Sequence, residues 1–220
     1  MKHVQALVRK EWQMELKQKH TLLGVLLYVL TTVFTCYLTM EKVESTSTWS
    51  ALVWITGVFA SFNAMQKVFF SEPAGVQMWM YTLVSPRQLI LSKMLYHGGV
   101  VAALQLLSML AFLFYFGMEG LEKMDFGQLA LVMLLGSMGL GITLTFVSSL
   151  AYKSGGGIGL IAILGFPLVI PLLTTMSRAT TFAVKGFPWE QNELQLVILL
   201  GLNAMTWVLA YVLFPYLWRE

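Results

Sequence analysis

Residues 128–151 read QLALVMLLGSMGLGITLTFVSSLA, and this stretch contains no charged side chain. A helix that crosses the hydrocarbon core of a bilayer needs about 20 predominantly apolar residues. The segment meets that requirement, so it predicts a membrane-spanning helix and sets the fold class for the chain around it.

Five further apolar segments flank this one. From the N-terminus, the six predicted spans cover about residues 21–40, 49–65, 94–116, 128–151, 158–176 and 194–217. Only 11% of the 220 residues are charged and 57% are hydrophobic, whereas a soluble domain has about 25% charged residues. An ordinary soluble enzyme and a disordered chain are therefore excluded. We predict an all-α polytopic membrane protein with six transmembrane helices, in which residues 1–220 form a single domain.

The charged residues lie outside the six predicted spans, and their distribution predicts the orientation. An even number of spans places both termini on one side, together with the connections at 66–93 and 152–157. That side carries ten basic and four acidic residues, and the other side carries four basic and seven acidic residues. By the positive-inside rule, both termini are predicted to be cytoplasmic. The net charge of +3 is thus a topology signal, and nucleic-acid binding is not expected.

Residues 1–20 are polar and basic, and we predict that they form a helix lying at the membrane surface. Val8, Trp12 and other apolar residues share one half of the helical wheel. Glu11 and Glu15 fall in the same half, so the amphipathic pattern is imperfect. The alternative interpretation is a plain helical extension of the first span.

The predicted spans contain no Asp, Glu, Lys or Arg. Ionisable residues inside the membrane mark proton relays, ion pathways and voltage sensors, so an ion-coupled transporter and an intramembrane proton pump are disfavoured. The chain also lacks the G-x-x-x-x-G-K-[ST] pattern of a phosphate-binding loop. Residues 154–157, SGGG, lack its lysine and are interpreted as a tight turn. If ATP provides the energy, a partner chain must bind it.

No catalytic motif is present, and we predict that the chain is not an enzyme. The patterns H-E-x-x-H, C-x-x-C and G-x-S-x-G are missing, and the single cysteine, Cys36, cannot form a disulfide within the chain. His97, just inside the third span, could ligate haem iron. The favoured interpretation is instead a polar residue that is hydrogen-bonded near the membrane interface. We expect this chain to bind no cofactor or metal by itself.

Two further segments interrupt the pattern of spans and loops. Residues 66–93 form the longest predicted cytoplasmic connection, which is too polar to span the membrane and too apolar for a free loop. Within the fifth span, Pro167 and Pro171 lie one helical turn apart. Because proline removes a backbone donor, the pair predicts a kink. This kink is a candidate hinge or cavity wall, with a purely structural bend as the alternative.

Together these features resemble the CcmB family, the membrane permease of the ABC-type complex in system I cytochrome c maturation. The similarity rests on RKEWQMELK at 9–17, on the connection from Phe69 to Lys93, and on the glycine-rich turn after Lys153 that leads into FPLVIPLL at 166–173. The last of these stretches is the most specific.

The resemblance implies a six-span ABC-2-type permease subunit in the bacterial inner membrane. ATP hydrolysis by a separate cytoplasmic ATPase would then drive haem export or the release of a haem-loaded chaperone. The implied partners are CcmA-like ATPase, CcmC-like and CcmD-like membrane subunits and a CcmE-like haem chaperone, with a second copy of this chain as a further candidate. Haem would be handled by the complex as a whole.

With this resemblance, residues 66–93 are interpreted as a cytoplasmic coupling element whose short amphipathic helices insert into a groove on the ATPase. The predicted docking residues are Phe69, Phe70, Glu72, Trp79 and Arg87. Lys93 is expected to join Glu72 and Arg87 in setting the register by charge complementarity. The alternative is a segment that lies on the lipid headgroups.

Two other functions are compatible with parts of this pattern. An ABC-2 exporter subunit for a lipid, drug or polysaccharide would share the architecture and differ in substrate. A membrane-embedded enzyme or assembly factor without an ATPase partner would need a polar cluster inside the spans. The distribution of charge in the sequence offers no such cluster.

Overall fold

The computed structural model of the chain describes residues 2–17, 19–40, 45–65, 68–70, 83–117, 123–155 and 157–219. The longer helices in these ranges are α1 (Lys2–Lys17), α2 (Lys19–Thr39), α3 (Thr46–Met65), α5 (Pro86–Phe116), α6 (Phe126–Lys153), α7 (Gly157–Val184) and α8 (Trp189–Arg219). No strand occurs in the described part of the chain, which confirms the predicted all-α class there.

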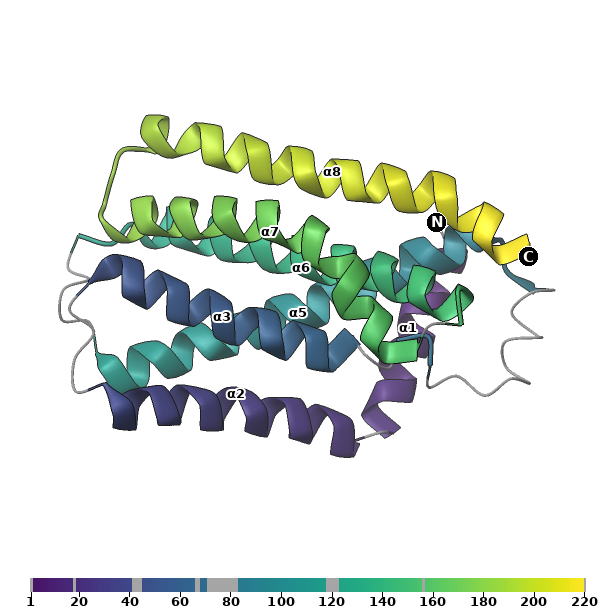
Figure 1. Cartoon of the computed structure of the whole chain (residues 1–220), viewed down its shortest axis with the longest axis horizontal. Helices are drawn as coiled ribbons and strands as arrows, with labels where there is room; N and C mark the ends of the chain where they lie inside the picture. The colour runs from purple at the N-terminus through teal and green to yellow at the C-terminus, as the bar shows by residue number, and fades with distance from the viewer. Residues whose placement is uncertain are drawn as a thin grey trace.

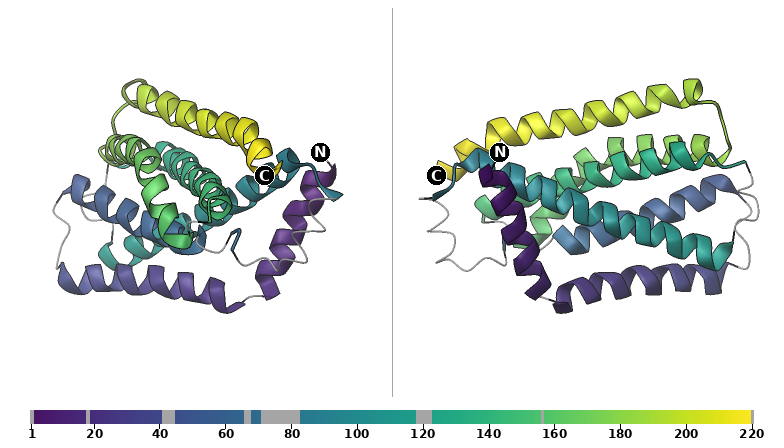
Figure 2. Two further views of the ribbon diagram at one scale, coloured as in Figure 1. Left: turned by 45° about the vertical axis from the view of Figure 1, so that its right-hand side comes forward. Right: turned by 180° about the vertical axis from the view of Figure 1, so that it is seen from behind.

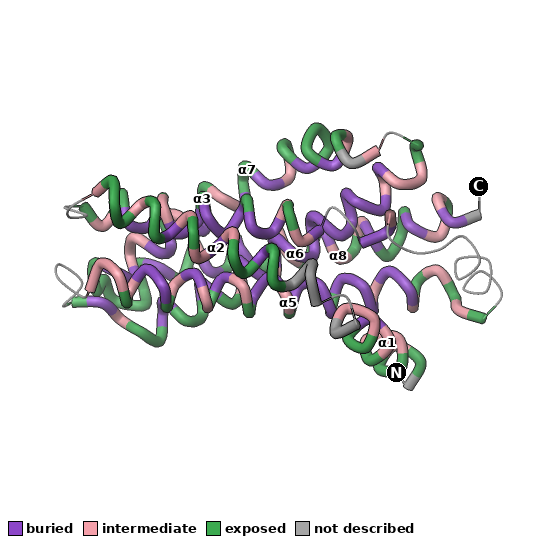
Figure 3. The backbone as a smooth tube through the Cα atoms, turned by 90° about the horizontal axis from the view of Figure 1, so that it is seen from below, coloured by how far each residue is buried: buried purple, intermediate pink, exposed green. Residues whose placement is uncertain are grey.

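The six helices α2, α3, α5, α6, α7 and α8 run side by side along the long axis of the molecule, and α1 lies across one end (Figure 1). Both chain termini lie at that same end, which we call the terminal end (Figures 1 and 2). Helix α6 packs against α3, α5, α7 and α8 and is buried along most of its length. Buried positions follow the inward sides of the helices and exposed positions the outside (Figure 3). The core is therefore organised around α6.

Helices α5 and α6 approach each other closely because of a glycine. A Cβ added at Gly141 would lie 2.7 Å from the Cα of Gly98 and 2.9 Å from the carbonyl oxygen of His97. Only a residue without a side chain fits such backbone contact, which is the usual role of small residues between membrane helices.

Among the described residues, α5, α6, α7 and α8 are long and apolar enough to cross a membrane, and Leu23–Thr39 within α2 is a shorter apolar helix. These helices support a multi-pass membrane protein. Both termini lie at one end (Figure 1), as an even number of spans requires. That the chain crosses the membrane six times, and that this end faces the cytoplasm, stay predictions.

Several helices extend beyond the predicted spans. Helix α5 begins at Pro86 instead of residue 94, because Ser85 caps it by accepting a hydrogen bond from the Gln88 N–H at 3.4 Å and proline suits a first helical position. Residues 86–93, predicted to belong to the connection, are thus part of α5. Arg178, in α7, and Glu190, in the first turn of α8, likewise lie inside helices and near their ends.

The axis of α7 changes direction along its length, as Figure 1 shows, and the helix contains both Pro167 and Pro171. Both prolines are exposed on the surface of the bundle. The hydroxyls of Thr174 and Thr175 donate to the carbonyl oxygen of Pro171 at 3.0 and 2.8 Å. The bend agrees with the predicted kink. The role of the two prolines as a hinge or cavity wall stays a prediction.

We call the end of the bundle away from the termini the distal end. Its helices are joined by hydrogen bonds of side-chain amides and by a helix cap. Asp125 accepts hydrogen bonds from the backbone N–H groups of Gly127 and Gln128 at 2.9 and 3.1 Å, which caps α6. The buried Gln128 amide donates to the Phe187 carbonyl at 2.8 Å. Its oxygen accepts a bond from Asn192 at 3.0 Å. This network joins α6, the α7–α8 turn and α8.

Candidate functional site

The first described residues after α3 fold back into the terminal end of the bundle. Val68 and Phe69 are 6% and 3% exposed. The Phe69 ring stacks on Tyr152 of α6 at a centroid distance of 6.2 Å and lies 6.1 Å from Phe214 of α8. Burial of a Phe side chain stabilises by about 1.5–3 kcal/mol, so Phe69 anchors the start of the connection to the bundle.

Lys93, on α5, is fully buried and links three separate parts of the chain. Its Nζ donates to the Val68 carbonyl at 3.1 Å and lies 3.3 Å from the Glu11 carboxylate of α1. The same ammonium lies 5.0 Å from the centroid of the Phe69 ring. A buried charge must be paired to be tolerated, and these groups meet that need. We call Glu11, Val68, Phe69 and Lys93 the Lys93 junction.

A second polar contact fastens α1 to α5 beside this junction. The Tyr96 hydroxyl donates to the Glu15 carboxylate at 2.5 Å, and the Trp12 and Tyr96 rings meet edge to face at 6.4 Å. Burial raises the pKa of the Glu15 carboxyl, the Tyr96 hydrogen bond opposes that shift, and the nearby Glu11 charge adds to it. Both acids that break the amphipathic pattern of residues 1–20 therefore have partners on α5.

The predicted docking residues lie in different surroundings. Phe69 and Phe70 are turned inward, and Phe70 meets the Tyr152 ring edge-on at 5.2 Å. Arg87 is exposed, with its guanidinium 4.7 Å above the Tyr211 ring of α8. Glu72 and Trp79 lie outside the described residues.

Lys93 does not fit the expectation that it sets register with a partner, because its side chain is 0% exposed. Its charge is used within the chain, in the ion pair with Glu11. Leu83, which sequence reasoning did not single out, is 74% exposed just before α5. It adds an apolar side chain that a partner could cover.

One comparison with known proteins covers nearly the whole chain. The sequence model of the CcmB protein family matches residues 2–216. The chain belongs to the CcmB family. A search among curated proteins found no match.

Membership of the CcmB family identifies the chain as a membrane permease component of an ABC-type haem exporter in cytochrome c maturation. It places the chain in a Ccm complex with an ATPase and other membrane subunits, and such a permease subunit is generally non-catalytic. The match confirms the resemblance seen in the sequence. It covers α1 and most of α8, so the Lys93 junction falls within the matched residues.

His97 lies one helical turn beyond Lys93 in this CcmB-family chain and is 7% exposed. Its ring lies 5.1 Å from that of Tyr96, and neither of its nitrogens has a hydrogen-bond partner among the described residues. The expected hydrogen bond near the interface is thus not found in the described part of the chain. Nor do the described residues contain a group of three or more His, Cys, Asp or Glu that could hold a metal ion.

Proposed function

We propose that this chain is the permease subunit that couples ATP hydrolysis by a separate CcmA-like ATPase to haem export or to the release of a haem-loaded CcmE-like chaperone. The family match over residues 2–216 carries this proposal. The sequence contains no phosphate-binding loop of its own, which agrees with a separate ATPase. We further propose the bacterial inner membrane as the location, with CcmC-like and CcmD-like subunits, and a second copy of the chain, as partners.

The Lys93 junction supports a mechanical route for this coupling. The connection after α3 is bonded to α5 and α1 through Lys93 and packs on α6 and α8 through Phe69. A buried ion pair that loses one partner costs about 3–5 kcal/mol, so the junction resists separation. A push on the connection by the ATPase would therefore move four helices together.

The docking surface of this proposal lies beyond Phe69 and Phe70, which serve as internal anchors. It comprises Glu72, Trp79 and Arg87, with Leu83 added because of its exposure. Apolar side chains with a charged rim suit a helix-in-groove contact. The same composition would suit a segment lying on lipid headgroups, so the test must measure the protein complex itself.

Co-purification of the ATPase with this chain tests the docking surface. Trp79→Asp and Leu83→Asp should each reduce the amount of ATPase recovered at least several-fold, because a carboxylate in an apolar groove loses its hydration. Phe126→Asp, at the distal end, should retain the ATPase fully; Phe126 is 55% exposed. Full recovery with both connection variants would reject docking through this surface.

We also propose that the isolated chain binds no haem, and that haem is handled by the assembled complex. The purified subunit should then lack a stoichiometric Soret band after incubation with haem. A band that appears in the wild type and disappears in His97→Ala would show instead that His97 is a ligand. That result would reject this part of the proposal and leave ATPase coupling intact.

A further inference from the structure

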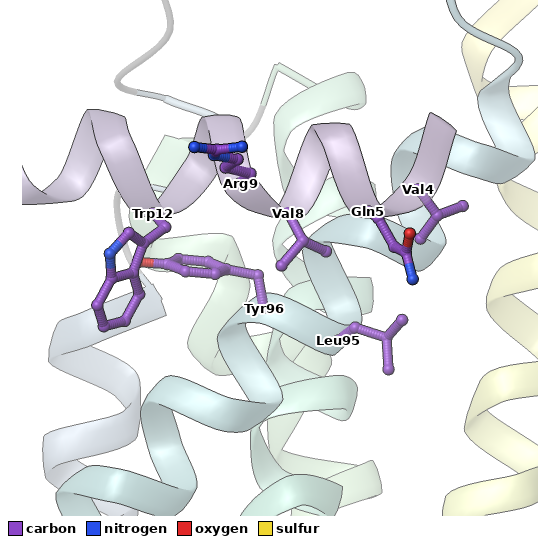
Figure 4. Close-up of a pocket in the computed structure, with 7 residues that line it drawn as sticks. All are labelled: Val4, Gln5, Val8, Arg9, Trp12, Leu95 and Tyr96. Carbon is purple, nitrogen blue, oxygen red and sulfur yellow. The ribbon is translucent and has the colours of Figure 1, made fainter. Parts of the chain in front are cut away.

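A continuous apolar groove lies between α1 and α5 at the terminal end of the bundle. One lobe, of about 410 Å³, is lined by Val4, Gln5, Val8, Arg9, Trp12, Leu95 and Tyr96 (Figure 4). The second lobe, of about 550 Å³, shares Val8, Trp12, Leu95 and Tyr96 with the first. It continues along α5 past Gly99 and Ala103 to Leu107. Each lobe has the volume of a small-ligand site.

The two lobes differ in charge. Arg9 and Gln5 line the first lobe, and Figure 4 shows both on α1, with the rings of Trp12 and Tyr96 beside each other below it. Glu15 lines the second lobe, where the Tyr96 hydroxyl is bonded to it. An anionic group would thus be attracted to the Arg9 lobe and repelled from the Glu15 lobe. The apolar part of the same ligand would extend along α5.

The surface charge of α1 adds to this asymmetry. Glu11 is buried in the Lys93 junction, and Glu15 is turned toward Tyr96. Arg9 is exposed, and the Lys10 side chain is 29% exposed. The outward face of α1 is therefore basic although the helix contains two acids. Basic residues at this position beside a membrane helix attract anionic lipid headgroups.

The length of the groove matches a lipid chain. From Leu95 to Leu107 the second lobe follows twelve residue steps of α5, which is about 18 Å at 1.5 Å per residue. One leaflet of the hydrocarbon core is about 15 Å thick, half of the 30 Å core. Gly99 and Ala103 are exposed and one turn apart, so the groove floor is shallow and open along this length.

We propose that this groove binds one anionic phospholipid, with its headgroup at Arg9 and an acyl chain along α5 from Leu95 to Leu107. The open side of the second lobe faces the surroundings of the bundle, where lipid is the solvent of a spanning helix. The ring of Trp12, which is 56% exposed, lies where the headgroup meets the chain, a position that Trp favours in membranes. This site is independent of ATPase docking and of haem handling.

Two pairs of matched variants test the site. Gly99→Leu fills the groove, and its added side chain starts in open space because no atom lies within 4 Å of a Cβ built there. Gly201→Leu in α8 is its control, since that glycine is also exposed and has no atom within 4 Å of an added Cβ. Arg9→Gln removes the headgroup charge, and Arg178→Gln removes an exposed cation from α7.

The measurement is native mass spectrometry of the purified full chain with phosphatidylglycerol or phosphatidylcholine. Wild type should retain phosphatidylglycerol in preference to phosphatidylcholine with one lipid per chain. Gly99→Leu should lower the retained phosphatidylglycerol roughly tenfold by displacing buried methylenes. Arg9→Gln should lower it about fivefold and remove the preference. Gly201→Leu and Arg178→Gln should match wild type.

Equal retention of the two lipids by wild type, or unchanged retention by Gly99→Leu, would overturn the proposal. So would a Gly99→Leu chain that keeps its lipid and loses a membrane subunit from the complex, because the groove would then hold a protein helix. If Gly99→Leu reduces the yield of folded protein, Ala103→Leu repeats the test one turn further along α5. Unchanged retention of phosphatidylglycerol by Ala103→Leu would then overturn the proposal.

Discussion

The terminal and distal ends of the bundle are fastened by different chemistry. At the terminal end, Lys93 and Glu11 form a buried ion pair between helices that are far apart in the sequence. At the distal end, the Gln128 and Asn192 amides are hydrogen-bonded to each other, and Gln128 also donates to the Asp125 carboxylate at 3.2 Å. The ion pair also holds the connection that follows α3, through the Val68 carbonyl. The amide network closes the short turn between α7 and α8, through the Phe187 carbonyl.

This difference separates an end held mainly by hydrogen bonds of amides from an end held by a buried ion pair. Neutral amides cost less to desolvate than charged groups, although the buried Asn192 Oδ1 has no hydrogen-bond partner among the described residues. A buried ion pair carries a large desolvation cost that only its geometry offsets. The terminal end is also where the proposed ATPase and lipid sites lie. We infer that the chain places its buried ion pair where partners act and its amide network at the opposite end.

The largest expected effect comes from removing the charge of Lys93. Lys93→Met removes the nearer of two ammonium partners of the buried Glu11 carboxylate, at 3.3 Å, and leaves the Lys10 ammonium at 3.7 Å. Removing one partner of a buried pair costs about 3–5 kcal/mol. The free energy of unfolding, measured by SDS titration in mixed micelles, should fall by up to that amount, because Lys10 still pairs with Glu11.

The matching control replaces both charges. Glu11→Leu/Lys93→Met removes both buried charges of the pair, so most of the lost stability should return, as for buried pairs exchanged for apolar residues. A double variant as unstable as Lys93→Met alone would show that the loss comes from packing. The comparison between an end held by an ion pair and an end held by amides would then be wrong.

The next largest effect is expected at the distal end. Asn192 is fully buried and donates to the Gln128 side chain at 3.0 Å and to the Ala179 carbonyl at 3.1 Å. Asn192→Leu leaves both acceptors without this donor, at a cost of about 1–3 kcal/mol. The same titration should show the loss. Asn63→Leu is the control, because Asn63 is exposed and bonds only to its own helix at Phe59 among the described residues; it should change stability little.

The long apolar helices could be predicted from the sequence because their apolar length is a local property of the chain. Residues 128–151 predicted α6 to within two residues at each end. The start of α5 was missed because the capping Ser85 and Pro86 extend the helix beyond its apolar part. A hydropathy pattern reports where the bilayer lies and not where the backbone hydrogen bonds end.

The Lys93 junction could not be predicted, although the sequence contained one sign that α1 has polar partners. Glu11 and Glu15 stood on the apolar half of residues 1–20, and an acid on an apolar face needs a partner. Nothing local identifies that partner, because it lies on another helix. Phe69 shows the same limit: its apolarity fits a partner's groove or its own bundle equally well, and only the fold places it against Tyr152.

Smaller effects follow from pH, and their sign differs between the two ends. Burial raises the pKa of Glu15 above its ordinary value of 4.5. A raised pKa in the folded state means that protonation favours the docked α1. That contribution is fully present below pH 4.5 and is lost as the pH rises through the raised pKa. Amide protection factors in α1, measured by hydrogen exchange, should therefore increase as the pH falls from 7 to 4.5, and Glu15→Gln should abolish this change.

Asp125 should respond in the opposite direction, and in a separate pH range. Hydrogen bonds, the strongest from the Gln128 backbone N–H, lower the pKa of Asp125 below its ordinary 3.8. Its contribution is thus complete above pH 3.8 and is lost as the pH falls through the lowered pKa. Protection in the first turn of α6 should decline only in that acid range, and Asp125→Asn, which retains the cap, should remove the decline. Because this range lies below that of Glu15, one titration followed at both ends separates them. If both ends loosened together on acidification, the terminal end would not depend on the burial of Glu15 against Tyr96.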